Sequence, residues 1–296
     1  MKLAILASED SWYASDLRRA AADWQEVAIL PFSTIQSTVG GNGARVSCGG
    51  RRLDEFHAVL VRTMPPGSLE QVVFRMDALA RCEAAGICVI NPPKAVEAAV
   101  DKYLTSARLQ AAGLPTPRTV VCQTWEDGLA AFDELGRDVV VKPLFGSEGR
   151  GISRVTDEDI AVRVFKTLVQ LGAVLYLQEF VPHEGYDLRL FVLGEQVLGM
   201  RRCNPSDWRT NVSRGATGAP CEVTDQFADM ARRAAAAVGA VVAGVDLLPA
   251  RCGALYVLEV NAVPGWRALA RTLDVDVARR VVEFVAAQVG TVNRWR

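Results

Sequence analysis

The sequence lacks long apolar runs and lacks a strong excess of charge of either sign. No run of about 18 or more apolar residues occurs, so no membrane span is predicted. The N-terminal segment MKLAILASED meets acidic residues too early for a signal peptide, and we expect it to form a first strand. With 33 basic and 34 acidic residues, the net charge of −1 is not typical of proteins that bind nucleic acid. We expect neither a membrane nor a nucleic-acid partner.

Histidine and paired cysteine motifs are also scarce. The only histidines, His57 and His183, are too few to favour a histidine-ligated transition metal. The seven cysteines are scattered and form no CxxC motif, which is typical of a reduced, cytoplasmic protein. No GxGxxG motif follows the first apolar strand, and the Walker A and protein-kinase signatures are absent as well. At 50% hydrophobic and 23% charged residues, the chain is expected to be globular with two or three subdomains.

The first 90 or so residues alternate between short apolar strands and amphipathic helices. This alternation predicts a small parallel α/β unit, with a hairpin or loop over residues 34–52. The predicted strands are 2–7, 27–30, 58–61 and 87–90, and the predicted helices are 12–24 and 68–85.

The dipeptide Pro92-Pro93 interrupts this pattern and marks a first boundary. Helices are then predicted over 102–111, capped by Asp101, over 124–135 and over 157–171. From residue 174 the chain reads as largely β, and the last two predicted helices, 223–238 and 274–288, are expected to cover that sheet. We therefore expect three domains, comprising residues 1–91, 92–173 and 174–296.

Residues 244–265, GVDLLPARCGALYVLEVNAVPG, read as two apolar strands joined at Cys252-Gly253. Pairing outward from this turn brings Asp246 opposite Glu259, with Asn261 on the same face as Glu259. Two carboxylates in an apolar hairpin repel each other unless a cation intervenes, and Mg²⁺ prefers such oxygen ligands. The alternative is that one carboxylate lies at a solvated sheet edge while the other meets an arginine.

Lys142 ends an apolar strand and is followed directly by the glycine-rich segment PLFGSEGRG. Such a loop lets backbone amides approach a phosphate chain while the lysine supplies positive charge. An ordinary β-hairpin turn is the alternative interpretation.

Further along, Gln178 to Val181 end a strand where a nucleotide base could bind the backbone, with Glu184 or Asp187 near a ribose; the alternative is a solvated strand end. Arginines then cluster with Asn211 in a pattern that suits phosphate or carboxylate oxygens. A basic surface loop is the alternative. The arginines of this cluster are Arg189, Arg201, Arg202, Arg209 and Arg214.

In combination, these residues resemble the ATP-grasp superfamily and, more narrowly, the RimK-type α-L-glutamate ligases. EVNAVPGW is similar to that family's E-x-N-x-x-P-G signature, and WRTNVSRG to its F-R-S-N-x-x-R-G segment. The resemblance covers about residues 92–290, whereas 1–91 match only as the small α/β domain that usually precedes the grasp. It implies an α/β (α+β) fold in which a small N-terminal parallel α/β domain precedes two ATP-grasp subdomains that sandwich ATP.

The resemblance also implies roles for individual residues. ATP would be bound by four groups of residues. They are two phosphate-binding lysines (Lys102 and Lys142), a mobile lid (Ser147, Glu148, Gly149 and Gly151), an adenine hinge (Gln178, Glu179, Phe180 and Val181) and an adjoining polar pair (Asp187 and Arg189). Two Mg²⁺ (or Mn²⁺) ions would be held by Asp246, Glu259 and Asn261. The transferred phosphate or acyl carboxylate would be bound by Arg202, Arg209, Asn211 and Arg214.

The implied activity is ATP-dependent formation of an amide bond from a carboxylate and an amine, through an acyl phosphate. We expect L-glutamate to be added to a small pterin-, furan- or folate-like acceptor by a homodimer or homotetramer. The sequence departs from the family's pattern in its lid, GSEGRG, and in Trp208, which replaces the commoner phenylalanine, so the acceptor stays open. The alternatives are glutamylation of a protein C-terminus, ligation of two free small molecules, and a non-catalytic ATP-binding regulator.

Overall fold

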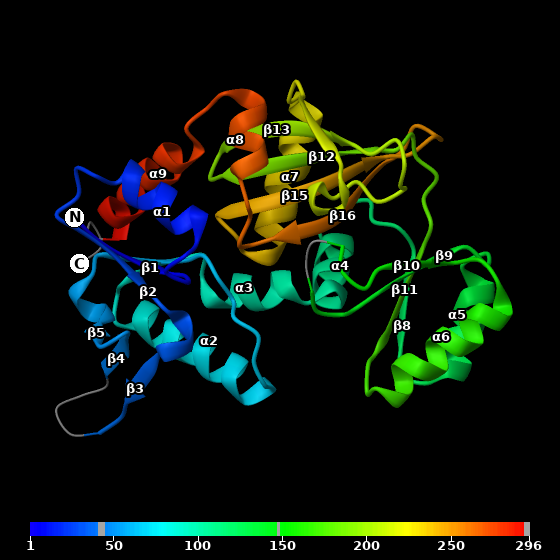
Figure 1. Cartoon of the computed structure of the whole chain (residues 1–296), viewed down its shortest axis with the longest axis horizontal. Coiled ribbons are helices and arrows are strands. Elements are labelled where there is room, and N and C mark those ends of the chain that lie inside the picture. Colours follow the sequence, from blue (N-terminus) through cyan, green and yellow to red (C-terminus); the bar gives the residue numbers. More distant parts are fainter. Residues whose placement is uncertain (41–44, 147–148, 293–296) are drawn as a thin grey trace.

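The computed structural model of the protein describes residues 1–40, 45–146 and 149–292. Within these ranges no helix is long and apolar enough to span a bilayer. Three larger sheets organise the chain, one on the left of Figure 1, one on the right and one above and between them.

The N-terminal sheet is parallel, with the strand order β2-β1-β6-β7, which confirms the predicted α/β unit. The Ser68 hydroxyl caps the second helix of this unit in a reciprocal capping box with Gln71. A small antiparallel sheet, β3-β4-β5, occupies most of the region expected to be a hairpin or loop. The elements are β1 (Lys2–Leu6), α1 (Trp12–Ala20), β2 (Glu26–Leu30), β3 (Gln36–Thr38), β4 (Arg45–Cys48), β5 (Arg51–Arg52), β6 (Ala58–Val61), α2 (Leu69–Ala84) and β7 (Cys88–Ile90).

Two short helices, α3 (Pro93–Val100) and α4 (Lys102–Ala111), lead from the N-terminal unit toward the rest of the chain (Figure 1). The Asp101 carboxylate accepts a hydrogen bond from Leu104 N at 3.0 Å, which confirms the predicted cap. Just before α3, the buried Asn91 amide donates to Val242 O and Ala262 O and accepts from two backbone amides of the C-terminal sheet. The predicted boundary is therefore a joint fixed by hydrogen bonds.

The central sheet is antiparallel, with the order β10-β9-β11-β8. Two helices pack against it, and Phe132 and Phe165 meet edge to face in the core between them. The elements are β8 (Thr119–Cys122), α5 (Trp125–Glu134), β9 (Val139–Lys142), β10 (Ser153–Val155), α6 (Glu158–Gln170) and β11 (Leu175–Glu179). Because β11 pairs with β8 and β9, this sheet extends beyond the expected boundary at 173, and we propose placing that boundary after Glu179.

The C-terminal sheet has the order β14-β13-β12-β15-β16, and α7 (Asp225–Val238) covers it as expected. Its strands are β12 (Tyr186–Leu193), β13 (Gln196–Cys203), β14 (Thr217–Pro220), β15 (Val242–Pro249) and β16 (Leu255–Asn261). The hairpin prediction is confirmed: Gly253 lies at the turn with φ +86°, and Asp246 is directly opposite Glu259.

The prediction for the final helical region was wrong in part. Instead of only covering the C-terminal sheet, α9 (Val277–Val292) packs against α1 and β7 of the N-terminal unit. Its apolar face shares one core with Leu3 and Ile5 on one side and Phe191 and Leu193 on the other. The helix α8 (Arg267–Leu273) precedes it and contacts β13 and β14. The last two helices therefore join the first and third sheets.

Candidate active site

A row of charged side chains crosses the C-terminal sheet from β13 to β16. The strand register places Arg202 opposite Asp187, Arg189 opposite Asp246, and Asp246 opposite Glu259. Cross-strand neighbours of this kind are close enough to interact directly. The sheet order therefore brings together residues that are separated by up to 72 positions in the sequence (259 − 187).

Asp246 is fixed by two arginines. Arg189 Nη1 donates to Asp246 Oδ1 at 2.5 Å, and Arg202 Nη2 donates to Oδ2 at 2.7 Å. Burial disfavours the charged carboxylate, but the two guanidinium groups outweigh it and keep the pKa of Asp246 below its ordinary value. Asp246 is thus an ionised, oriented carboxylate, and the arginine partner considered as an alternative is present.

Arg202 continues this network to the neighbouring strand. Its guanidinium binds both oxygens of Asp187, with the Nε–Oδ1 distance at 2.8 Å. Thr210 Oγ1 donates to Asp187 Oδ2 at 2.6 Å. All three side chains are at most 8% exposed. Asp187 was predicted to lie in the ATP site near a ribose, whereas here it binds Arg202 and Thr210 of the loop after β13.

Glu259 differs from Asp246 because it has no hydrogen-bond or ion-pair partner among the residues that the structure describes. It is half-buried and lines the pockets on both sides of the charged row. Asn261 Oδ1 accepts a hydrogen bond from Val263 N at 2.9 Å. The described residues contain no group of three or more His, Cys, Asp or Glu side chains placed to hold a metal. The predicted ligand set is instead two carboxylates and an amide, and the unpartnered Glu259 fits a hard cation.

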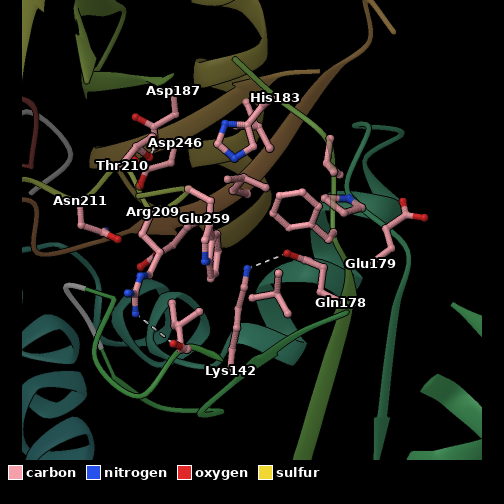
Figure 2. A pocket seen from close by; sticks show the side chains of 18 of the residues that line it. Lys142, Gln178, Glu179, His183, Asp187, Arg209, Thr210, Asn211, Asp246 and Glu259 are labelled. Atoms are coloured by element: carbon pink, nitrogen blue, oxygen red, sulfur yellow. Dashed lines mark hydrogen bonds between the residues drawn. The ribbon is translucent and has the colours of Figure 1, made fainter. Parts of the chain in front are cut away.

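Two lysines face these carboxylates from the central part of the chain. Lys142 Nζ donates to Gln178 Oε1 at 2.6 Å (Figure 2), and Lys102 Nζ donates to Gly146 O at 2.8 Å. Burial lowers the pKa of Lys142 to about 8, with Glu259 acting in the opposite direction. Burial also lowers the pKa of Lys102. Desolvated cations of this kind gain most when an anion binds.

Gln178 links Lys142 to a buried polar chain. Its amide nitrogen donates to Thr119 Oγ1 at 3.0 Å and to Tyr176 Oη at 3.2 Å, and Tyr176 Oη in turn lies 2.8 Å from Ser106 Oγ. Gln178 therefore positions Lys142 with its side chain rather than contributing only backbone.

The predicted hinge lies beside an aromatic wall. Figure 2 shows the Glu179 carboxylate pointing away from the other labelled groups, and it accepts a hydrogen bond from Arg118 N at 2.9 Å. Phe180 contacts Trp208 with ring centroids 5.8 Å apart, and Arg154 lies over the Phe180 ring at 3.5 Å. Val181 N has no acceptor among the described residues, so this amide can donate to a ligand.

The glycine-rich loop closes on the loop after β13. A Cβ added at Gly149, whose φ is +70°, would lie 2.5 Å from Asn211 Oδ1. Arg209 pairs with Asp207 at 2.8 Å and donates to Ile152 O at 3.4 Å (Figure 2). A Cβ added at Gly151, whose φ is +72°, would lie 2.8 Å from Pro143 Cγ. The predicted lid and anion-binding loop are therefore in direct contact.

Some predicted site residues lie outside the described part of the chain. These are Ser147, Glu148 and the side chain of Arg214.

Two adjoining pockets meet at the charged row. The first lies between the hinge, Lys142 and Trp208, and the second extends toward the N-terminal unit. They share Arg202, Asn211, Asp246 and Glu259. A ligand in each pocket would thus meet the other at the carboxylates.

The N-terminal unit contributes Tyr13 and Arg62 to the second pocket, and neither was predicted to line a site. Arg62 directly follows an apolar strand, and the same pattern had pointed to Lys142, so the signal was present. Thr210 was not predicted either, because a threonine in a polar loop carries no distinctive pattern.

The site has two lysines beside a glycine-rich loop, and they face carboxylates on a hairpin across a cleft between two sheets. This arrangement is that of an ATP-grasp ligase. The chain belongs to the RimK-like ATP-grasp family, whose domain description matches residues 99–285. It is accordingly an ATP-dependent ligase that joins a carboxylate to an amine.

Full-length relatives are similar across both chains. The tetrahydromethanopterin:alpha-L-glutamate ligase of Methanocaldococcus jannaschii is 34% identical over 297 residues, covering 98% of this chain and 99% of that one. The ribosomal protein bS6–L-glutamate ligase of Escherichia coli is 29% identical over 297 residues, covering 98% and 97%.

Solved structures confirm the fold. The ATP-grasp ligase PsnB, complexed with a minimal precursor, has a TM-score of 0.77 at 23% identity and covers 97% of this chain and 98% of its own. A RimK-domain ATP-grasp protein from Sphaerobacter thermophilus has a TM-score of 0.74 at 23% identity, covering 96% and 99%.

Proposed function

We propose that this ligase adds L-glutamate to a carboxylate of a small pterin-like acceptor. The relatives named as tetrahydromethanopterin:alpha-L-glutamate ligases match it over nearly its whole length at 32–34% identity, and the ligase named for a ribosomal protein at 29%. The observation that carries the proposal is the position of Asp246 and Glu259 where two pockets meet. Such a junction suits a reaction that joins two separately bound substrates.

ATP occupies the first pocket in this proposal. The Val181 amide and the Phe180–Trp208 wall suit an adenine ring, since aromatic walls and a few polar groups are typical of such sites. Lys102 and Lys142 are desolvated cations without a carboxylate in an ion pair among the described residues, and both suit phosphate oxygens.

Magnesium would be held by Asp246, Glu259 and Asn261, and we propose two ions. Carboxylate and amide oxygens are its preferred protein ligands. When bound, Mg²⁺ supplies neutralisation of phosphate charge. Asp246 keeps further lone pairs beyond those used by Arg189 and Arg202, because an ionised carboxylate offers about four acceptor sites.

The reaction proceeds in two steps. An acceptor carboxylate oxygen attacks the γ-phosphorus of ATP, the bond to the β–γ bridging oxygen breaks, and ADP leaves with that electron pair. The neutral amine of glutamate then attacks the acyl carbon, phosphate departs, and the amine proton goes to solvent or phosphate. Arg209 and Asn211 bind the transferred phosphoryl group, and the contact between Gly149 and Asn211 excludes water from the acyl phosphate.

The test is an assay of ADP release with MgATP, isotope-labelled L-glutamate and tetrahydromethanopterin as the acceptor probe. We expect ADP in proportion to acceptor that gains one glutamyl residue by mass spectrometry. Label only in polypeptide, with cell extract as the acceptor source, would instead support glutamylation of a protein C-terminus. If the protein binds ATP but releases no ADP in a glutamate-dependent manner with any acceptor, the result would contradict ligase turnover and support a non-catalytic regulator.

Self-association stays a prediction. Light scattering on the purified protein would distinguish the expected dimer or tetramer from a monomer.

A further inference from the structure

Arg62 is a buried cation without a counter-ion in the described part of the chain. It directly follows β6, is 7% exposed and lines the second pocket. Its Nη2 donates to Pro264 O at 2.7 Å, whereas its Nε is buried and has no hydrogen-bond partner. A buried polar atom left unpaired costs free energy that a bound ligand can recover.

The guanidinium of Arg62 is rigidly framed by aromatic rings. Its Cζ lies 4.4 Å from the centroid of Trp266 and 5.3 Å from that of Tyr13, and these two rings pack edge to face at 5.0 Å. Trp266 is itself fixed by a hydrogen bond from Nε1 to Asp16 at 3.0 Å. A Cβ at Gly265 would lie 2.5 Å from the Tyr13 hydroxyl, so the two parts of the chain meet closely here. The cation is therefore pre-organised rather than free to turn toward solvent.

The second pocket contains more positive than negative charge. Five arginines line it against two carboxylates, Asp246 and Glu259, and Asp187, which pairs with Arg202, lowers the excess to two positive charges. Two of the five, Arg189 and Arg202, already bind Asp246. The other three are Arg62, Arg267 and Arg271, and none of these forms an ion pair with any described residue.

These three arginines approach the pocket from two sides. Arg62 comes from the N-terminal sheet, whereas Arg267 and Arg271 lie one turn apart on α8 and are exposed near its mouth. Residues four apart on a helix share a face, so both guanidinium groups can reach the same ligand. Guanidinium forks bind carboxylates in a bidentate manner, which adds orientation to the charge attraction.

We propose that Arg62, Arg267 and Arg271 bind the two carboxylates of the amine-donating dicarboxylic amino acid. This inference rests on the proposed function. Its amino group would then face the opposite end of the pocket, where Asp246 and Glu259 adjoin the first pocket. The same pocket could instead take a carboxylate of the acceptor, but an excess of two positive charges matches a free dicarboxylate better than a single terminal carboxylate.

The main test replaces Arg62 with methionine, which keeps the length and apolar contacts of the side chain but removes the guanidinium. Initial rates are measured while L-glutamate, ATP and acceptor are varied in turn. Because a hydrogen bond to a charged group contributes about 1.5–3 kcal/mol, we expect the KM for L-glutamate to rise about 10–100-fold. The KM values for ATP and acceptor should stay within about twofold.

Direct binding separates this inference from turnover. Titration calorimetry of L-glutamate into the protein with MgADP needs no acceptor. The wild-type protein should bind L-glutamate at least about tenfold more tightly than L-glutamine, which lacks one carboxylate, and Arg62→Met should lose most of that preference. If glutamate binds in this way but no acceptor is ever glutamylated, the proposed function fails while the pocket assignment stands.

Matched controls separate a binding role from a structural one. Arg75 is a similarly buried arginine, 5% exposed, whose Nη1 donates to Pro65 O at 2.7 Å, and it does not line the pocket. Arg75→Met should leave the KM for L-glutamate unchanged. Arg267→Met and Arg271→Met alter exposed side chains and should each raise it about 3–10-fold, so these variants decide the question even if Arg62→Met does not fold.

Three results would overturn the proposal. One is an unchanged KM for L-glutamate with a raised KM for acceptor, which would assign the pocket to the acceptor. Another is an equal rise in the KM values for ATP and glutamate, which would indicate a structural role. The third is equal binding of L-glutamate and L-glutamine by the wild-type protein.

Discussion

Replacing Lys142 with methionine should stabilise the protein while impairing ATP binding. The ammonium group is enclosed beside Gln178 and the Tyr176 ring, and burial lowers its pKa from 10.5 to about 8. A depressed lysine pKa means that the folded state disfavours the charged form. The cost is carried at neutral pH, where the lysine is protonated in both the folded and unfolded states.

The magnitude follows from the pKa. A shift of about 2.5 units at 1.36 kcal/mol per unit corresponds to a cost of about 3 kcal/mol at pH 7. Methionine also removes the hydrogen bond that the charged ammonium donates to Gln178, which contributes about 1.5–3 kcal/mol. The net gain should be about 1 kcal/mol, or roughly 2–4 °C in the thermal midpoint.

The dependence on pH gives the reasoning a sharper test. Because the folded pKa lies below the unfolded one, the unfolded chain binds more protons between about pH 8 and pH 10.5, and the wild-type protein gains stability over that window. The advantage of Lys142→Met should therefore be constant below about pH 8, vanish near pH 9 and reverse at higher pH, because the wild-type protein regains about 1.4 kcal/mol per pH unit in that window.

Thermal or urea unfolding at several pH values would measure this difference. Lys94→Met is the matched control, since Lys94 is exposed and pairs with Glu97 on the surface. It should change the midpoint by less than about 1 °C at any of these pH values. Two results would contradict this prediction. One is a Lys142→Met protein that is less stable than wild type at pH 7, and the other is a stability difference that does not change with pH.

Three further outcomes follow from the same site. Glu259→Gln should lower turnover at least about 100-fold with little change in stability. Asp246→Asn should lower turnover and also reduce the free energy of unfolding by about 3 kcal/mol, because it leaves two buried arginines undercompensated. Kinetics and melting curves distinguish these two outcomes. Gly149→Ala should lower kcat more than it lowers the unfolding midpoint, because its Cβ would clash with Asn211 Oδ1 at 2.5 Å, and rapid-mixing assays would detect this. The KM for ATP should rise as pH exceeds about 8, where Lys142 loses its proton in the free enzyme; a flat profile between pH 7 and 9.5 would contradict this.

The sequence predicted local features of the fold well. Counting outward from the glycine turn paired Asp246 with Glu259, and the structure confirms that pair. The register nearer the turn differs, since Leu247 pairs with Val257, and an irregularity between Asp246 and Leu247 that the sequence did not reveal restores the predicted pair. The helix starts at Ser68, Asp101 and Thr124 were equally local, since a capping side chain binds an amide three residues later.

Features that depend on sheet order could not be predicted. The sequence shows that Asp187 and Arg189 alternate on one strand, but not that β13 and β15 lie on opposite sides of it. Only that order gives Asp187 and Arg189 different partners. For the same reason, the sequence did not reveal that β11 belongs to the central sheet. The packing of α9 against α1 was missed because an amphipathic face does not specify which surface it covers.

The buried charges across the C-terminal sheet are better explained by positioning than by stability. Buried ion pairs gain little net free energy, because desolvation offsets most of their attraction. Here each oxygen of Asp246 is held by a different arginine, one from β12 and one from β13, and Asp187 holds Arg202 from a second side. The carboxylate therefore has a fixed orientation at the junction of both pockets. Glu259 has no such partner in the described part of the chain, so its carboxylate can bind a ligand at this junction.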